Sequence, residues 1–224
     1  MKGNKIEFEG EYLSGDRNGK GKEYYYNDNL KFEGEYSNGK RNGKGKEYFN
    51  DGKLEFEGEF SNGKRNGKGK EYDCNGKLEF EGEYLNGKRW NGIGKEYDND
   101  CILKYEGEYI KGERNGKGKE YDCDGKIKYE GEYLNGERNG KGKEYYYNGE
   151  LIFEGIYLNG KIWNGKGYHK NGKIEFEISD GKGYIKEYNS DCEWVFQEEY
   201  LKGERHGKGK EYDSNSYVSD IDDF

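Results

Sequence analysis

Residues 32–55 read FEGEYSNGKRNGKGKEYFNDGKLE, and residues 56–79 repeat this text as FEGEFSNGKRNGKGKEYDCNGKLE. The unit recurs along the chain, and the glycine of its Glu-Gly step returns every 24 or 25 residues. These glycines are Gly10, Gly34, Gly58, Gly82, Gly107, Gly131 and Gly155. Self-similarity at a fixed period of this size indicates a stacked repeat array. Such an array offers an extended surface rather than a single pocket.

The composition is unusual for a folded chain, because only 29% of the residues are apolar and 38% are charged. Such values are typical of disorder. The aromatic residues (17% of the chain) and the 39 glycines recur in register, however, and this indicates regular structure. No apolar segment approaches the roughly 18 residues of a membrane span, and residues 1–10 do not resemble a signal peptide. We expect a cytoplasmic protein, peripheral to a membrane or to the cytoskeleton if it associates with either.

Each repeat contains two turn signals, which are Asn38-Gly39 and Asp51-Gly52 in the quoted unit. Both dipeptides favour two-residue type I′ turns, in which both central residues have positive φ. The predicted fold is therefore all-β, an elongated single-layer antiparallel β-hairpin solenoid over residues 1–212. Its nine units begin near residues 8, 32, 56, 80, 105, 129, 153, 176 and 196, and the last two are degenerate. We expect the acidic segment 213–224 to form a frayed tail.

Counting outward from the Asn38-Gly39 turn predicts the register of the two strands. The expected pairs are Tyr36 with Arg41, Gly34 with Gly43, Glu33 with Lys44 and Phe32 with Gly45. Because side chains alternate across a strand, one face carries aromatic rings and glycines and the other carries Glu–Lys pairs. Each ring can then lie across a facing glycine and cover its backbone. Alternation places Glu47 on the aromatic face, whereas a bulge would bring Tyr48 there, and the pattern leaves both possibilities open.

Two repeats carry one extra residue in the second strand, namely Trp90 and Trp163. One added residue opposite an unchanged partner strand is a β-bulge. We therefore expect the array to bend or twist at these two positions.

The Glu-Gly-Glu strand, the Asn-Gly-Lys turn and the Gly-x-Gly pair together closely resemble the MORN (membrane occupation and recognition nexus) repeat. Residues 144–155, EYYYNGELIFEG, are also similar to the MORN variant of bacterial YwqK-type antitoxin proteins. The resemblance covers roughly residues 5–212 and implies a groove-shaped rod of β-hairpins. It further implies a cytoskeletal or membrane-junction scaffold, a self-associating rod, or a targeting array fused to an enzyme. The chain shows no attached catalytic domain, so only the scaffold role is implied here.

The aromatic face is the first candidate site, because a single sheet leaves it without a covering layer. One interpretation is that curling of the sheet buries most rings against each other. The other is that the remaining apolar surface forms a groove for a protein partner or for a second copy, as a homodimer or end to end. The groove would be lined by Phe32, Tyr36, Phe56, Phe60, Phe80, Tyr84, Tyr105, Tyr109, Tyr129 and Tyr133.

A basic rim at the Asn-Gly turns of repeats two to four is the second candidate site. Its residues are Lys40, Arg41, Lys64, Arg65, Lys88 and Arg89. They are either ordinary solubilising charges or contacts of a peripheral membrane adaptor with anionic lipid headgroups. The net charge of −8 opposes non-specific binding to membranes or nucleic acids.

Enzymatic chemistry has little support in the sequence. The Gly-Lys runs lack the spacing and the following Ser or Thr of a phosphate-binding loop. No Cys-x-x-Cys pair is present, and His169 and His206 have no recurrent partners for a zinc site. Cys74 and Cys123 occupy equivalent slots about 19 Å apart, too distant for a disulfide. We expect a non-enzymatic scaffold with no cofactor, metal, small-molecule substrate or nucleic-acid partner.

Overall fold

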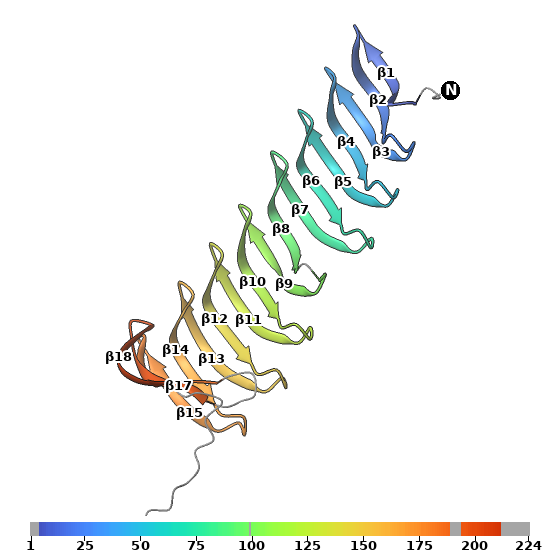
Figure 1. Cartoon of the computed structure of the whole chain (residues 1–224). Helices are drawn as coiled ribbons and strands as arrows, with labels where there is room; N and C mark the ends of the chain where they lie inside the picture. Colours follow the sequence, from blue (N-terminus) through green and yellow to red (C-terminus); the bar gives the residue numbers. More distant parts are fainter. Residues whose placement is uncertain (1–4, 99, 189–193, 212–224) are drawn as a thin grey trace, which may run out of the picture. The chain divides into compact units, whose positions relative to one another are not determined.

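The computed structural model describes residues 5–98, 100–188 and 194–211 (Figure 1). These residues form eighteen β-strands joined by short turns, and the described part of the chain contains no helix. The prediction of an all-β fold made of antiparallel hairpins is confirmed. The predicted tail at 213–224 lies outside the described residues.

The chain divides into two compact units. Unit 1 comprises Met1–Glu96 and Glu106–Arg114, and unit 2 comprises Tyr97–Tyr105 and Asn115–Phe224. The strands that begin in unit 1 before its first break are β1 (Phe8–Leu13), β2 (Asp16–Tyr24), β3 (Leu30–Ser37), β4 (Lys40–Tyr48), β5 (Leu54–Ser61), β6 (Lys64–Tyr72), β7 (Leu78–Leu85) and β8 (Lys88–Tyr97). The strands β9 (Leu103–Ile110) and β10 (Glu113–Tyr121) are divided between the units. Unit 2 further contains β11 (Ile127–Leu134), β12 (Glu137–Tyr145), β13 (Leu151–Leu158), β14 (Lys161–Tyr168), β15 (Ile174–Ser179), β16 (Lys182–Tyr188), β17 (Trp194–Leu201) and β18 (Glu204–Glu211).

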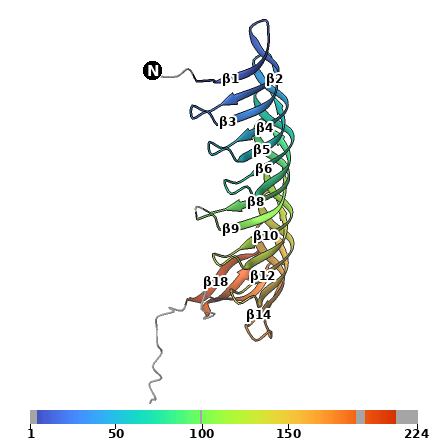
Figure 2. The ribbon, with the colours of Figure 1, turned by 90° about the vertical axis from the view of Figure 1, so that its right-hand side faces the viewer.

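Within each unit the strands follow the order of the chain. In unit 1 every strand from β2 to β7 pairs antiparallel with the strand before it and the strand after it. Unit 2 repeats this arrangement from β12 to β17. The side view shows that the hairpins are bent rather than flat (Figure 2). The sheet of each unit is thus a single layer that curves along its strands.

The first turn of each repeat is the type I′ turn that the Asn-Gly signal predicts. Asn38 and Gly39 have φ of 50° and 76°, and the equivalent residues of the other repeats also have positive φ. The turn also links neighbouring hairpins, because the Gly63 N–H donates to the Arg41 carbonyl at 2.9 Å. The same bond recurs from Gly87 to Arg65 at 2.8 Å.

The prediction of a two-residue turn at Asp51-Gly52 is wrong. Gly52 alone has positive φ, at 87°. Its N–H donates to the Phe49 carbonyl at 2.9 Å, and the Phe49 N–H donates to the Lys53 carbonyl at 2.8 Å. These bonds define a three-residue loop with a left-handed glycine at its end. The Asp51 carboxylate stabilises the loop by accepting the Lys53 N–H at 3.1 Å.

The predicted register is correct at the turn and wrong beyond it. Tyr36 pairs with Arg41 as expected, but Gly34 pairs with Gly45 rather than with Gly43. Glu35 alone therefore lies opposite residues 42–44, which is a bulge in the second strand. Gly43 absorbs the bulge with φ of 96°, a conformation that glycine adopts without steric cost. The further pairs that result are Glu33 with Lys46 and Phe32 with Glu47.

The two tryptophan insertions change this bulge instead of creating one. In β8, Tyr84 pairs with Arg89 and Glu83 pairs with Asn91, so Trp90 is the single extra residue. In β14, Tyr157 pairs with Ile162 and Ile156 pairs with Asn164, which leaves Trp163 in the same place. At each insertion the bulge therefore contains one extra residue instead of two. The remainder of the same strand is shifted in register against the preceding strand.

The core of unit 1 is a row of aromatic rings laid over paired glycines. A Cβ added at Gly34 would lie 2.7 Å from Cζ of Phe32, and one at Gly45 would lie 2.5 Å from the same atom. The ring of Phe32 also packs edge-on against Phe60 of the next hairpin, with centroids 5.1 Å apart. Aromatic cover of glycine backbone, as predicted, therefore allows two strands to approach closely while a side chain fills the space above them.

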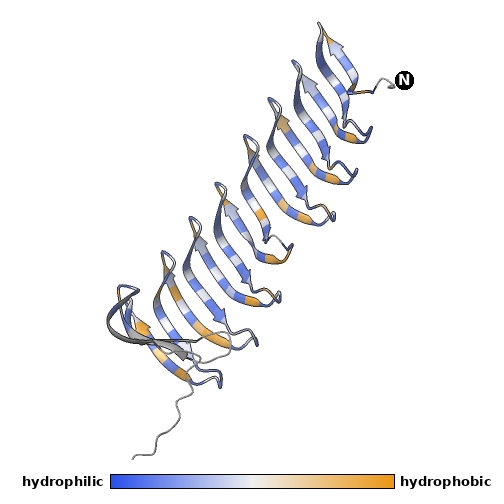
Figure 3. Ribbon diagram, viewed as in Figure 1, coloured by the Kyte–Doolittle hydropathy of each residue, from blue (hydrophilic) through white to orange (hydrophobic). Residues whose placement is uncertain are grey.

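The hydropathy pattern agrees with this arrangement. Hydrophilic and neutral residues occupy most of each strand, and the apolar bands are short (Figure 3). A chain with so few apolar residues folds because the rings of its core are buried almost completely, and Phe32, Phe56 and Phe80 are all 0% exposed.

Replacing Gly45 by Ala should lower the free energy of unfolding by about 1–3 kcal/mol, because the new methyl group overlaps the Phe32 ring. Gly52→Asn is the matched control. Gly52 has open space around it, and Asn tolerates its left-handed conformation, so the expected cost is about 1 kcal/mol or less. Urea denaturation followed by far-UV circular dichroism measures both. Equal losses of stability in the two variants would contradict the role of the ring.

Candidate functional site

The structure buries the aromatic residues that the sequence placed in a partner groove. All ten have exposed fractions between 0% and 8%. The expectation that they line an accessible groove therefore needs correction, and the alternative interpretation, burial by curling, describes them. The physical reason is that charged side chains of the same face, among them the arginines expected at the basic rim, close over the rings.

Arginine side chains provide this cover. The Arg41 guanidinium lies over the Phe32 ring, 4.2 Å from its centroid, and Arg65 lies over Phe56 at 4.5 Å. Such stacking adds a cation–π attraction to the burial of the ring. Arg138 covers Tyr129 in unit 2 in the same way, at 4.0 Å.

Each arginine is in turn held by glutamates of its own and neighbouring hairpins. Arg65 forms ion pairs with Glu47 at 2.6 Å and with Glu71 and Glu55 at 2.7 Å. Glu47 also pairs with Arg41 at 2.5 Å. The side chains of Arg65 and Glu47 are only 14% and 19% exposed. Alternating Arg and Glu thus form a continuous chain along unit 1, named here the Arg–Glu chain.

The position of Glu47 answers the question that the sequence left open. Glu47 lies on the aromatic face, where it pairs with Phe32 on one side and Phe56 on the other. Tyr48 lies on the opposite face, and its hydroxyl donates to Glu33 at 2.6 Å. Simple alternation therefore holds at the end of the strand, because the bulge adds two residues and keeps the faces unchanged.

The Arg–Glu chain lowers the pKa values of Glu71 and Glu23. Burial raises the pKa of Glu71, but the charges and hydrogen bonds of Arg89 and Arg65 outweigh it and bring the pKa below its ordinary value. For Glu23, burial likewise raises the pKa, but the hydrogen bond and charge of Arg41 outweigh it and bring the pKa below its ordinary value. Both carboxylates are therefore more strongly ionised in the folded state than in the unfolded chain.

The second candidate, the basic rim, separates into two kinds of residue. Lys40, Lys64 and Lys88 are exposed beside the turns. Their arginine neighbours Arg41, Arg65 and Arg89 are engaged in the Arg–Glu chain and over the rings. Only the lysines can therefore contact a surface without dismantling the core.

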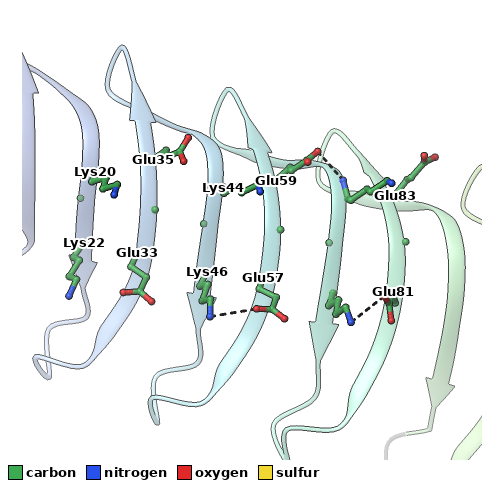
Figure 4. A pocket seen from close by; sticks show the side chains of 18 of the residues that line it. Lys20, Lys22, Glu33, Glu35, Lys44, Lys46, Glu57, Glu59, Glu81 and Glu83 are labelled. Atoms are coloured by element: carbon green, nitrogen blue, oxygen red, sulfur yellow. Dashed lines mark hydrogen bonds and ion pairs between the residues drawn. The ribbon is translucent and has the colours of Figure 1, made fainter.

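An accessible recess in unit 1 lies on the other face, the one that carries the Glu and Lys residues (Figure 4). This recess, named here the charged groove, has a volume of about 1010 Å³ and extends over strands β1 to β7. Its lining residues are Glu9, Lys20, Gly21, Lys22, Glu33, Gly34, Glu35, Lys44, Gly45, Lys46, Glu57, Gly58, Glu59, Lys68, Gly69, Lys70, Glu81, Gly82 and Glu83.

The charged groove has a floor of glycine backbone between two rows of charged side chains (Figure 4). The floor follows the paired glycines across the strands, for example Gly45 with Gly34 and Gly58. The upper row consists of Lys20, Glu35, Lys44, Glu59, Lys68 and Glu83. The lower row consists of Glu9, Lys22, Glu33, Lys46, Glu57, Lys70 and Glu81, with Lys46 and Glu57 3.6 Å apart. The sequence correctly placed these charges on one face but did not identify them as a site, because an alternating lattice is also an ordinary solvated surface.

The upper row is tied to the bulge. The Glu59 carboxylate folds over Gly67 and accepts the Lys68 backbone N–H at 3.2 Å. Glu11 accepts the Lys20 N–H at 3.3 Å, and in unit 2 Glu132 accepts the Lys141 N–H at 3.0 Å. This glutamate thus satisfies a backbone donor that the bulge leaves unpaired.

The shift of register in β8 interrupts the alternation. Ile93 takes the place of a lysine opposite Glu81, and it is 65% exposed. In the upper row Asn91 donates to Glu83 at 2.8 Å. The regular series of charges in unit 1 therefore ends at the first tryptophan insertion, and this boundary can be read from the sequence.

The sequence matches the family described as MORN repeat over residues 8–30, 32–53, 56–77, 105–127, 129–150 and 199–216. These segments cover more than half of the chain, and the protein therefore belongs to the MORN repeat family. MORN repeats are non-enzymatic repeats that generally serve as scaffolds for interactions with proteins or lipids. No curated protein matches the chain.

Two further properties of the described residues bear on function. They include no helix that is long and apolar enough to cross a membrane. Within the same residues, His, Cys, Asp and Glu side chains do not gather into a group that could hold a metal ion.

The Arg–Glu chain should make the fold sensitive to acid. The lowered pKa values of Glu71 and Glu23 stabilise the folded state above the unfolded pKa of about 4.3. This stability is lost as the pH falls from about 5 through the lower pKa values of the folded state. Urea denaturation between pH 7 and pH 3 should show the midpoint falling in that window.

Glu71→Gln tests the assignment of this acid sensitivity. It should cost about 1–3 kcal/mol at pH 7, because two arginines lose a charged partner, and it should flatten the acid dependence. Glu57→Gln on the more exposed face is the control, with an expected cost of about 0.5 kcal/mol or less. An unchanged acid dependence in Glu71→Gln would contradict the assignment.

Proposed function

We propose that the protein is a non-enzymatic scaffold that binds an extended segment of a partner protein along the charged groove of unit 1. The observation that carries this proposal is the open glycine floor. The aromatic residues, which the sequence suggested as the contact surface, support the groove from behind as its core.

The two faces of the sheet favour the groove as the contact surface. On the aromatic face, the arginines and glutamates bind one another and cover the rings, as the three ion pairs of Arg65 illustrate. On the groove face, the backbone of the paired glycines is open between the two charged rows, because the side-chain positions of these residues point to the aromatic face. A ligand chain can therefore lie close to the sheet, with the two charged rows at its sides to fix its position.

An extended ligand suits this geometry better than a small molecule. The groove crosses seven strands, which corresponds to about 29 Å at about 4.8 Å between neighbouring strands. Repeat proteins use such extended surfaces to bind long segments of their partners.

The proposal predicts that filling the groove prevents binding. Lys46→Trp should weaken the binding of a copurified, identified and separately purified partner protein by tenfold or more, about 1.4 kcal/mol, without changing the circular dichroism spectrum. Lys53→Trp places the same side chain on an exposed loop outside the lining of the groove and should leave the Kd unchanged. Isothermal titration calorimetry measures both. A partner that binds the two variants equally would exclude the groove as its site.

A second candidate function is that of a peripheral membrane adaptor, and the exposure of Lys40, Lys64 and Lys88 favours it. Each basic residue near an anionic surface contributes about 1 kcal/mol. Under this proposal, changing the three lysines together to Gln should abolish flotation with vesicles that contain phosphoinositides. The same three changes should leave the affinity for a groove-bound protein unchanged. Absence of flotation by the unmodified protein at low salt would remove this candidate.

A further inference from the structure

The charges of the groove differ in how far the protein itself neutralises them. In the lower row, Glu57 accepts the Tyr72 hydroxyl at 3.0 Å as well as pairing with Lys46, and Glu81 pairs with Lys70 at 3.2 Å. Glu33 accepts the Tyr48 hydroxyl at 2.6 Å. In the upper row, Glu59 is held by the backbone of the bulge. The glutamates are therefore engaged within the fold.

The lysines of the upper row are different. Lys20, Lys44 and Lys68 are exposed, and among the described residues none of their ammonium groups forms an ion pair or a side-chain hydrogen bond. Each stands across from a glutamate of the next hairpin, as Lys44 stands across from Glu59, but that carboxylate turns toward the bulge. The groove thus presents a row of ammonium groups that the protein leaves for an external anion.

The spacing of these ammonium groups defines the ligand that fits them. They lie on the alternate strands β2, β4 and β6, so neighbouring groups are about 9.6 Å apart along the groove. A peptide in the extended polyproline II conformation has three residues per turn and rises about 3.1 Å per residue, so every third side chain points the same way and successive ones lie about 9.3 Å apart. An α-helix would need seven residues, about 10.5 Å, and would fall out of step by about 1 Å at each lysine.

We propose that the upper row of the charged groove binds an acidic, extended peptide segment in which carboxylates recur at every third residue. Lys20, Lys44 and Lys68 would each bind one carboxylate, while the peptide backbone lies over the glycine floor. The inference rests on the proposed function of the groove, and it adds the chemical class and the charge spacing of the ligand.

The periodic spacing of the lysines distinguishes a ligand with periodic carboxylates from a ligand that is merely rich in negative charge. The groove contains more glutamates than lysines, so a dense anion gains little from the groove as a whole. A ligand that places its charges only at the lysine positions avoids the intervening carboxylates. Single-stranded RNA carries a phosphate at every nucleotide and would meet these carboxylates along its whole length.

Two synthetic peptides of identical composition test the proposal on the full chain. The first carries four glutamates at every third position, separated by Gly and Ser, and the second carries the four glutamates consecutively. Fluorescence anisotropy at low ionic strength should show the periodic peptide binding about three- to tenfold more tightly, because three exposed ion pairs form in register. Equal affinities, no binding of either peptide, or tighter binding of single-stranded RNA would overturn the proposal.

Matched variants of the protein identify the residues responsible. Lys44→Gln/Lys68→Gln should weaken the periodic peptide about three- to tenfold and reduce the salt dependence of its binding. Lys40→Gln/Lys64→Gln removes the same charge from the same two hairpins at the turns and should have little effect. Equal binding by the two variants would overturn the proposal.

The tests of the proposed function and of this inference can fail separately. A partner protein that fails to bind the Lys46→Trp variant but still binds the Lys44→Gln/Lys68→Gln variant would support the groove as a binding site. The same result would overturn the proposal of a ligand with regularly spaced carboxylates. A partner that binds equally to the Lys46→Trp and Lys53→Trp variants would instead exclude the groove itself.

Discussion

The stacking of an arginine over an aromatic ring that itself covers two glycines is the interaction on which the structure depends. Phe56 fills the space above Gly58 and Gly69, Arg65 covers the ring, and glutamates hold the guanidinium. Each layer needs the one beneath it, since an arginine without a ring loses its position and a ring without its arginine faces water. A single sheet thereby obtains a core without a second layer of secondary structure, which explains how a chain with 38% charged residues folds.

Much of this fold can be predicted from the repeat. The period, the hairpins, the Asn-Gly turns and the two faces follow from local rules of turn conformation and side-chain alternation. The position of Tyr36 opposite Arg41 also follows, because it lies within the reach of the turn. The register beyond this pair does not, because Gly43 opens a bulge, and glycine permits positive φ without requiring it.

The location of the candidate site was harder to predict for a related reason. An aromatic stripe such as Phe32 and Tyr36 is equally compatible with an exposed groove and with a buried core. The deciding factor is the direction taken by Arg41, which the sequence analysis placed at a basic rim. In the structure this arginine turns inward to Glu23 and Glu47. Long side chains that can either extend into solvent or fold over a ring are not assigned by pattern alone.

The sharing of glutamates between hairpins has a consequence for the length of the protein. Because Glu47 bridges Arg41 of its own hairpin and Arg65 of the next, and Glu23 and Glu71 repeat this pattern, neighbouring hairpins of unit 1 form equivalent contacts. Removal of one whole period would bring equivalent contact partners together again, whereas removal of a few residues would not. Insertion or deletion of one complete repeat would therefore preserve these contacts, and the length of this part of the protein can change only in steps of one hairpin.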